Sequence, residues 1–322
     1  MNKDITGSRS LPDDSQNPPD YSAYSDTASV SSSSQAKRVP RGQAPKVTKN
    51  VSTTATPYCP FPPVMKAYYQ WNLSGIKVFF LCGPNGEQER LFAVEQHMGY
   101  SLGPPLGTRP GMILYNGTKT KDYILAACCD ESYQAVRPYA FNPNSIILLP
   151  PWEFGSKFMV REIMRARTTE DNGVAFRFSL EVGHEEKKRR ETFEWKKITK
   201  ADKDEDAKQG GFKLLHVLPS PEQSQQRGGS SSQGLVNASS SSSAAAAAGS
   251  GDEVLAMFAW TKTLSNLKHP FTLEFVGSGR TGAWGERWTL AVIITAMRLW
   301  MLHWYAKTNR PVVHMSEKMN KA

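Results

Sequence analysis

The chain has 322 residues, of which 39% are hydrophobic, and a formal net charge of +9. This length allows one sizeable hydrophobic core, and the positive charge favours anionic partners such as a membrane surface. The basic residues are scattered apart from one dense run at Lys187–Arg190, so no specific nucleic-acid binding is expected. No CxxC spacing links the four cysteines, and neither a metal site nor a cofactor is expected.

Residues 1–56 are rich in Ser, Pro, Asp, Gln and Lys and have no hydrophobic periodicity. Such a segment cannot bury enough apolar surface to offset its ordering entropy, so a disordered tail is predicted. Its polar, charged start differs from a signal peptide, which favours a cytoplasmic location. The tail contains a P-P-x-Y sequence, which WW domains bind as an extended segment in an aromatic groove. A WW-domain partner would contact Pro18, Pro19 and Tyr21.

Short apolar or alternating runs begin near Lys66, separated by Gly, Pro, Asn or charged residues. About twelve such runs at close spacing predict a β-sandwich or barrel. They are Tyr68–Leu73, Lys77–Cys82, Leu91–Gln96, Met112–Tyr115, Tyr123–Cys129, Ile146–Leu149, Phe158–Arg165, Val174–Val182, Thr192–Ile198, Phe212–Leu218, Val254–Trp260 and Phe271–Val276. The Ser- and Ala-rich residues 219–251 interrupt this series and are predicted to be a disordered insertion at the surface.

Residues 286–306 contain no helix breaker and carry apolar side chains on every side. A helix of this kind is either buried all round or spans a bilayer. The residues expected to form its apolar body and its one central charge are Trp288, Leu290, Val292, Ile293, Ile294, Met297, Arg298, Leu299, Trp300 and Leu302.

Residues 288–306 would cover roughly 28 Å as a helix, close to the hydrocarbon thickness. The central Arg298 argues against a membrane span, because it costs about 2.5–3.5 kcal/mol on insertion scales. Thr295 and Arg298 lie on one helix face, where inward polar groups of a barrel wall could pair with the guanidinium. We therefore expect the helix to fill a barrel of residues 66–306, with residues 307–322 as a C-terminal tail. A tail-anchored single-span protein is the alternative.

Four features carry a family resemblance: Phe193-Glu194-Trp195, the strands Val254–Trp260 and Phe271–Val276, and the helix Trp288–Tyr305. Together they resemble the tubby C-terminal domain and its relatives, the phospholipid scramblases and LURP-one-related proteins, and are similar to fungal proteins of this kind. The resemblance covers about residues 66–306. It implies a mainly β fold, with a closed antiparallel barrel of about twelve strands around a hydrophobic C-terminal helix.

The resemblance also implies membrane-related functions, because tubby domains bind phosphoinositides and scramblases associate with membranes. No tubby phosphoinositide-binding motif can be placed on this sequence. The multi-cysteine palmitoylation cluster of scramblases is represented only by the pair Cys128-Cys129. Neither activity can therefore be assigned to particular residues by resemblance.

The run Lys187, Lys188, Arg189 and Arg190 separates two predicted strands, and so should lie at a hairpin tip, with Lys196 and Lys197 on the returning strand. Clustered cations near an anionic membrane contribute about 1 kcal/mol each. These six residues are the candidate site for a lipid headgroup or another anion. A solvated hairpin tip and a nuclear localisation patch remain alternatives.

Other motifs give no support for catalysis. Gly277–Gly282 fits G-x-G-x-x-G but lacks the βαβ unit and the later acidic residue of a dinucleotide site, so a turn is expected there. The sequence has no G-x-S-x-G, and its histidines have no metal-ligand spacing. We expect a non-enzymatic, membrane-peripheral lipid- or protein-binding adaptor. The alternatives are the tail-anchored protein and a soluble scaffold that recruits WW-domain partners.

Overall fold

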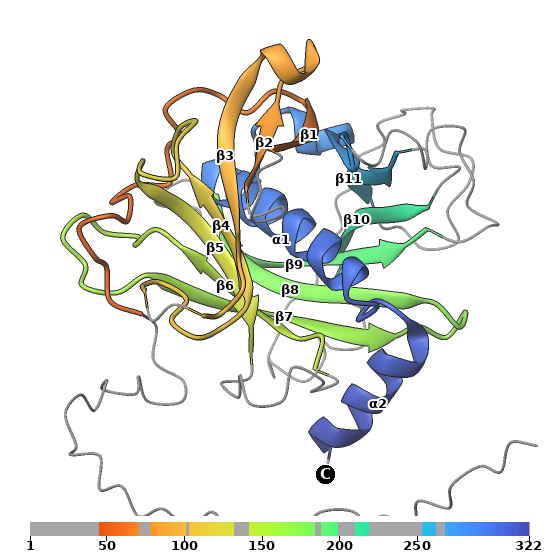
Figure 1. The fold of residues 1–322 in the computed structure, drawn as a ribbon. Coiled ribbons are helices and arrows are strands. Elements are labelled where there is room, and N and C mark those ends of the chain that lie inside the picture. Colours follow the sequence, from red (N-terminus) through yellow and green to blue (C-terminus); the bar gives the residue numbers. More distant parts are fainter. Residues whose placement is uncertain are drawn as a thin grey trace, which may run out of the picture. The chain divides into compact units, whose positions relative to one another are not determined.

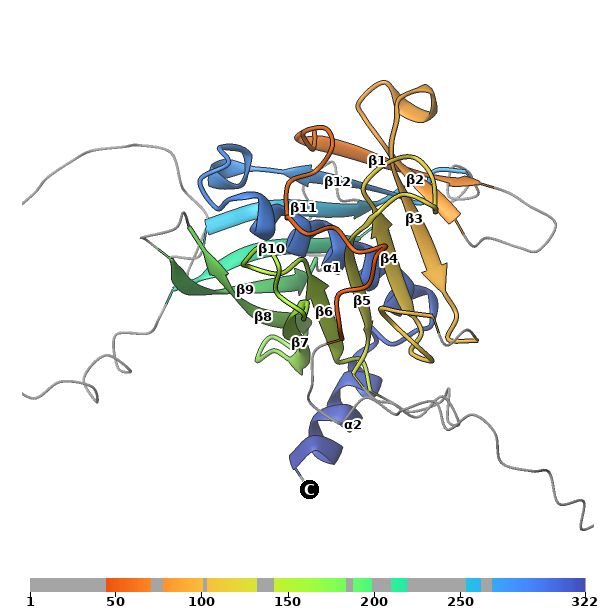
Figure 2. The ribbon, with the colours of Figure 1, turned by 90° about the vertical axis from the view of Figure 1, so that its left-hand side faces the viewer.

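The computed structural model describes residues 45–70, 78–100, 103–131, 142–183, 188–198, 210–218, 253–261 and 268–321. In this part of the chain, the strands form one closed antiparallel barrel with helix α1 inside it (Figure 1). A view turned by 90° shows the strands on several sides of α1 (Figure 2). The predicted mainly β fold, closed around the C-terminal hydrophobic helix, is confirmed.

Each strand pairs with its neighbours in the chain, and β1 pairs with β12 to close the barrel. Closure removes the exposed edges that an open sheet would present to other chains. The strands are β1 (Val64–Gln70), β2 (Val78–Cys82), β3 (Arg90–His97), β4 (Gly111–Tyr115), β5 (Ile124–Asp130), β6 (Ser145–Leu149), β7 (Val160–Thr168), β8 (Val174–Val182), β9 (Arg189–Lys197), β10 (Gly211–Val217), β11 (Glu253–Trp260) and β12 (Phe271–Phe275).

The interior is built from alternating strand residues packed against α1 (Glu286–Trp304). In β8 the large apolar side chains occupy every second position and are buried, while the residues between them face outward. All ten helix residues named from the sequence are buried inside the barrel. No helix in the described part of the chain is long and apolar enough to cross a membrane.

A second apolar cluster lies on the outer side of the barrel wall, where β6 is buried on both faces. Part of the predicted tail, residues 45–56, packs there through Val47 and Val51. The N–H of Val47 donates to the carbonyl of Lys157 (2.9 Å), and the N–H of Ile124 donates to that of Asn50 (2.6 Å). We call residues 45–56 the outer strap. Residues 1–44 and the predicted insertion 219–251 lie outside the described residues.

The chain after α1 forms a second helix, α2 (Arg310–Lys321), which projects from the barrel in Figure 1. Val313 and Ser316 are buried, and the Glu317 carboxylate accepts hydrogen bonds from the N–H (3.1 Å) and hydroxyl (2.7 Å) of Thr168 at the end of β7. The segment expected to be a C-terminal tail thus contains a helix fixed to the barrel on one face.

Candidate functional site

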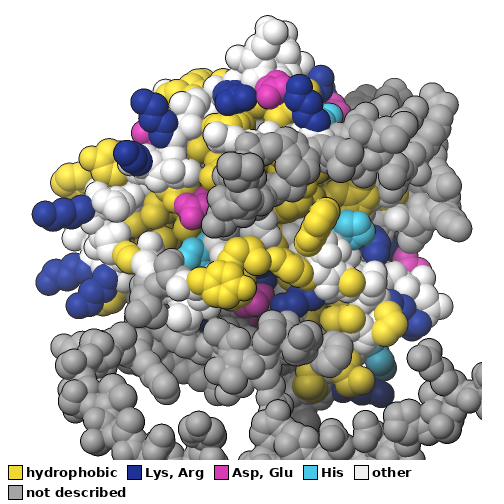
Figure 3. Space-filling view, in the orientation of Figure 1, with side chains coloured by type: hydrophobic (Ala, Val, Ile, Leu, Met, Phe, Trp, Pro, Cys, Tyr) yellow, Lys and Arg dark blue, Asp and Glu magenta, His cyan; other side chains and the backbone are white. Residues whose placement is uncertain are grey.

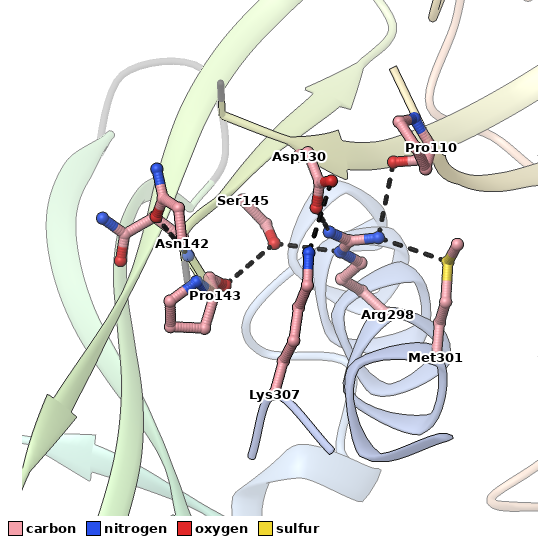
Figure 4. Close-up of polar contacts among 9 residues, drawn as sticks. Pro110, Asp130, Asn142, Pro143, Ser145, Arg298, Met301 and Lys307 are labelled. Atoms are coloured by element: carbon pink, nitrogen blue, oxygen red, sulfur yellow. Dashed lines mark hydrogen bonds and ion pairs between the residues drawn. The ribbon is translucent and has the colours of Figure 1, made fainter. Parts of the chain in front are cut away.

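Arg298 is 1% exposed and projects from α1 toward the wall of the barrel (Figure 4). Its guanidinium forms an ion pair with Asp130 and donates from Nε to Ser145 Oγ (3.0 Å). Lys307 Nζ lies 3.6 Å from the same carboxylate, and burial lowers the pKa of this lysine. Asp130 and Ser145 come from β5 and β6, so inward polar groups of the wall pair with Arg298 as predicted. Because Arg298 is paired with residues of the barrel wall, we assign this cluster a structural role.

The basic run predicted as a headgroup site begins β9, beside the N-terminal end of α1. Lys187 lies outside the described residues, while Lys188 and Arg189 are exposed. The Arg189 guanidinium pairs with Glu191 (Nε to Oε1, 2.6 Å) and lies over the Trp284 ring, 5.7 Å from its centroid. These two basic side chains therefore reach the solvent at one end of the barrel.

Arg190 has a different environment from its neighbours. Its two terminal nitrogens donate to the two carboxylate oxygens of Glu162 (3.1 and 2.6 Å), and these bonds raise the arginine pKa. It also donates to the carbonyl of Ser179 (3.2 Å), beyond the last paired residues of β7 and β8, Arg165 and Arg177. Arg190 therefore bridges β7 and β8 through its hydrogen bonds, although its side chain remains 53% exposed.

Lys196 and Lys197 lie at the other end of β9, about 26 Å from the hairpin tip at strand geometry. Lys196 Nζ pairs with Asp171 (2.9 Å). Lys197 Nζ donates to the carbonyl of Thr308 (3.3 Å), and burial lowers its pKa. The structure therefore does not bring these two lysines together with the basic residues at the tip.

Trp152, in the loop between β6 and β7, joins the hairpin tip to α1. Lys188 Nζ lies 4.5 Å from the centroid of the Trp152 ring, and the Arg287 guanidinium lies 3.9 Å from it. Arg287 donates to the carbonyls of Pro150 (2.6 Å) and Pro151 (2.9 Å), and burial lowers its pKa to about 10. Cation–π contacts with a tryptophan are the strongest of their kind. The contacts of Lys188 and Arg287 with Trp152 hold the hairpin tip close to the β6–β7 loop.

The same loop carries Phe154, which is 88% exposed, and exposed Lys157. We call Trp152, Phe154, Lys157, Lys188 and Arg189 the aromatic–basic rim. Only Lys188 and Arg189 of this rim were predicted from the sequence, because the contact between Lys188 and Trp152 joins segments that are far apart in the chain. The aromatic composition of residues 150–158, P-P-W-E-F-G-S-K-F, was the available signal for the rest.

Two further surfaces carry notable side chains. On the outer side of β7 and β8 an arginine-lined groove includes Arg167 and Arg177, which both donate to the buried carboxylate of Glu194 (3.3 and 2.8 Å). At the C-terminal end of α1 and along α2, exposed hydrophobic side chains include Trp304 and Met315. Figure 3 shows hydrophobic side chains in this region and Lys and Arg spread elsewhere over the same face. Glu162 and Glu194 partly neutralise the positive charge of the groove, whereas the second surface is mainly apolar.

The WW-ligand motif and the glycine-rich turn were the other motifs singled out in the sequence. Pro18, Pro19 and Tyr21 of the WW-ligand motif lie outside the described residues. Gly277–Arg280 forms a short turn of 3₁₀ helix before α1. Among the residues that the structure describes, no three His, Cys, Asp or Glu side chains are grouped to hold a metal ion. Comparisons with protein-family models, curated proteins and solved structures found no match.

Proposed function

We propose that this chain is a non-enzymatic, membrane-peripheral binding module of tubby-like fold, acting in the cytoplasm. Its aromatic–basic rim would contact anionic phospholipids, phosphoinositides among them. The observation that carries the proposal is the placement of Lys188 against Trp152, with the buried Arg287 on the same ring. The buried guanidinium of Arg287 adds to the positive potential around the exposed Lys188. The Lys188 side chain is restrained by its contact with Trp152, so it loses less conformational freedom when it binds.

The rim is favoured over the arginine-lined groove because of how the charges are paired. In the groove, Glu194 accepts from two arginines and Glu162 holds Arg190. At the rim, Lys188 forms no ion pair with the described residues, and the Arg189 side chain is 65% exposed despite its contact with Glu191. Headgroup phosphates can therefore approach Lys188 without displacing a carboxylate, whereas Arg189 keeps its contact with the largely buried Glu191.

Vesicle co-sedimentation of the full-length protein tests the proposal. Vesicles of phosphatidylcholine with phosphatidylserine should bind the protein, and vesicles of phosphatidylcholine alone should bind it much more weakly. At about 1 kcal/mol per cation, replacing Lys188 and Arg189 with Ala should weaken binding by about 30-fold. The matched control replaces Arg310 and Lys318 with Ala, because these exposed cations lie on α2.

The outcome separates the proposal from its alternatives. Equal binding of the two double variants would show that net charge, rather than the rim, attracts the protein. If the wild-type chain ignores anionic vesicles and a WW domain captures it through Tyr21, the scaffold alternative replaces the lipid-binding one. If only detergent extracts the chain from membranes, the tail-anchored alternative gains support, although α1 would then have to leave the barrel.

A further inference from the structure

The loop between β6 and β7 turns sharply at Phe154. The N–H of Ser156 donates to the carbonyl of Glu153 (3.1 Å), which makes Phe154 and Gly155 the central residues of a β-turn. Gly155 has φ +88°, the left-handed conformation that a type II turn requires at its third position. Phe154 occupies the second position, at the apex of this turn. Its side chain is 88% exposed there.

The base of this loop is anchored on the barrel. The N–H of Val47 in the outer strap donates to the carbonyl of Lys157 (2.9 Å), and the N–H of Met159 donates to that of Pro45 (3.1 Å). Met159 is buried in the outer apolar cluster. On the other side of the loop, the carbonyls of Pro150 and Pro151 accept from Arg287. An aromatic side chain at the tip of an anchored loop needs little further ordering to bind a partner.

The charges around Phe154 indicate the kind of partner. Lys157 in the loop and Lys188 and Arg189 at the neighbouring hairpin tip are exposed, and Glu153 is the one acidic residue of the loop. A second phenylalanine of the loop, Phe158, is 45% exposed. Aromatic side chains bordered by Lys and Arg fit an anionic bilayer, in which the rings enter the headgroup–acyl boundary while the cations stay at the phosphates.

We infer that Phe154 is the side chain that the rim inserts into an anionic lipid bilayer. This inference rests on the proposed function and adds an apolar contribution to a binding mode otherwise based on charge. The two contributions respond differently to salt. Ionic strength of about 1 M shortens the Debye length to about 3 Å and weakens the attraction of Lys188 and Arg189, whereas burial of the phenyl ring persists.

The test uses the full-length chain and vesicles of phosphatidylcholine with phosphatidylserine. Phe154→Ala should weaken vesicle binding by about 10-fold to 100-fold, the loss expected when one phenyl side chain remains in water. Phe154→Trp should bind as the wild type does. The matched control is Tyr100→Ala, which removes a 92% exposed ring near Tyr305 at the opposite end of α1 and should leave binding unchanged. Because Phe154 is exposed, the thermal midpoint of Phe154→Ala should equal that of the wild type.

Depth is measured with an environment-sensitive fluorophore at position 154, introduced through Phe154→Cys in a chain that also carries Cys59→Ser. We expect a blue shift on vesicle binding. Wild-type binding with no blue shift, or with no loss in Phe154→Ala, would overturn insertion and leave the proposed function standing. Absence of any vesicle binding by the wild-type chain would overturn both, and would point to a protein as the partner of the rim.

Discussion

Replacing Arg298 with Met should destabilise the fold by about 3 kcal/mol. Removing one partner of a buried ion pair costs about 3–5 kcal/mol, because the remaining charge stays buried without compensation. Asp130 would keep Lys307 at 3.6 Å, so the lower end of this range applies. Ser145 Oγ and the carbonyl of Pro110 would each lose a donor as well. Met fills a similar volume, which keeps the cavity contribution small.

Urea unfolding followed by tryptophan fluorescence measures the effect. At a slope of about 3 kcal/mol per M, the midpoint should fall by about 1 M. Adding Asp130→Asn to Arg298→Met should restore about 1 kcal/mol, because the carboxylate that lost Arg298 is then neutral, although Lys307 loses its partner. The control Arg310→Met alters an exposed arginine and should change stability by less than about 0.5 kcal/mol. A change below 1 kcal/mol in Arg298→Met, or no recovery in the double variant, would refute the view that this ion pair is buried in the core.

Three further changes probe the barrel. Trp195→Phe removes the donor to Thr295 Oγ1 (2.9 Å) and should cost about 1–2 kcal/mol in urea unfolding. Burial lowers the pKa of His269. Between that pKa and about 6.5 the unfolded chain binds more protons than the folded chain, so stability falls as the pH falls. His269→Phe keeps the stacking on Tyr68 and should flatten this part of the pH–stability curve. Glu194→Ala leaves two partly exposed arginines unpaired and should cost about 1 kcal/mol, an effect that a midpoint equal to wild type would disprove.

Periodicity explains why the barrel and its helix could be predicted. The strand from Val174 to Val182 carries its large apolar side chains at every second position, and the face that they form is buried. The helix lacks a polar face, and its central Arg298 indicated a protein interior with a polar partner. These signals are local in the sequence, because a side chain's place in the period determines its side of the wall. The identity of the partner, Asp130, depends on the order of strands around the barrel and could not be derived locally.

The parts that sequence analysis missed depend on contacts between distant segments. Val51 lies in a polar stretch with no periodicity, and its burial follows from the apolar outer face of β5 and β6. Lys196 and Lys197 were grouped with the hairpin tip, although the length of β9 separates them from it. Strand alternation alone would have placed two consecutive lysines on opposite faces. Basic residues on one predicted strand should therefore be treated as one site only when the length of the strand leaves them close together.

The central helix also links the core to the proposed binding surface. Close packing of apolar side chains holds α1 in the barrel, and polar contacts add directional restraints on its rotation and its position along the barrel. Thr295 and Arg298 fix it near the middle through Trp195 and the wall, and Arg287 fixes its N-terminal end through two carbonyls of the β6–β7 loop. Because Arg287 also lies against Trp152, the position of the helix sets the position of the rim. Changes in the core that shift α1 should therefore alter membrane binding without touching an exposed residue.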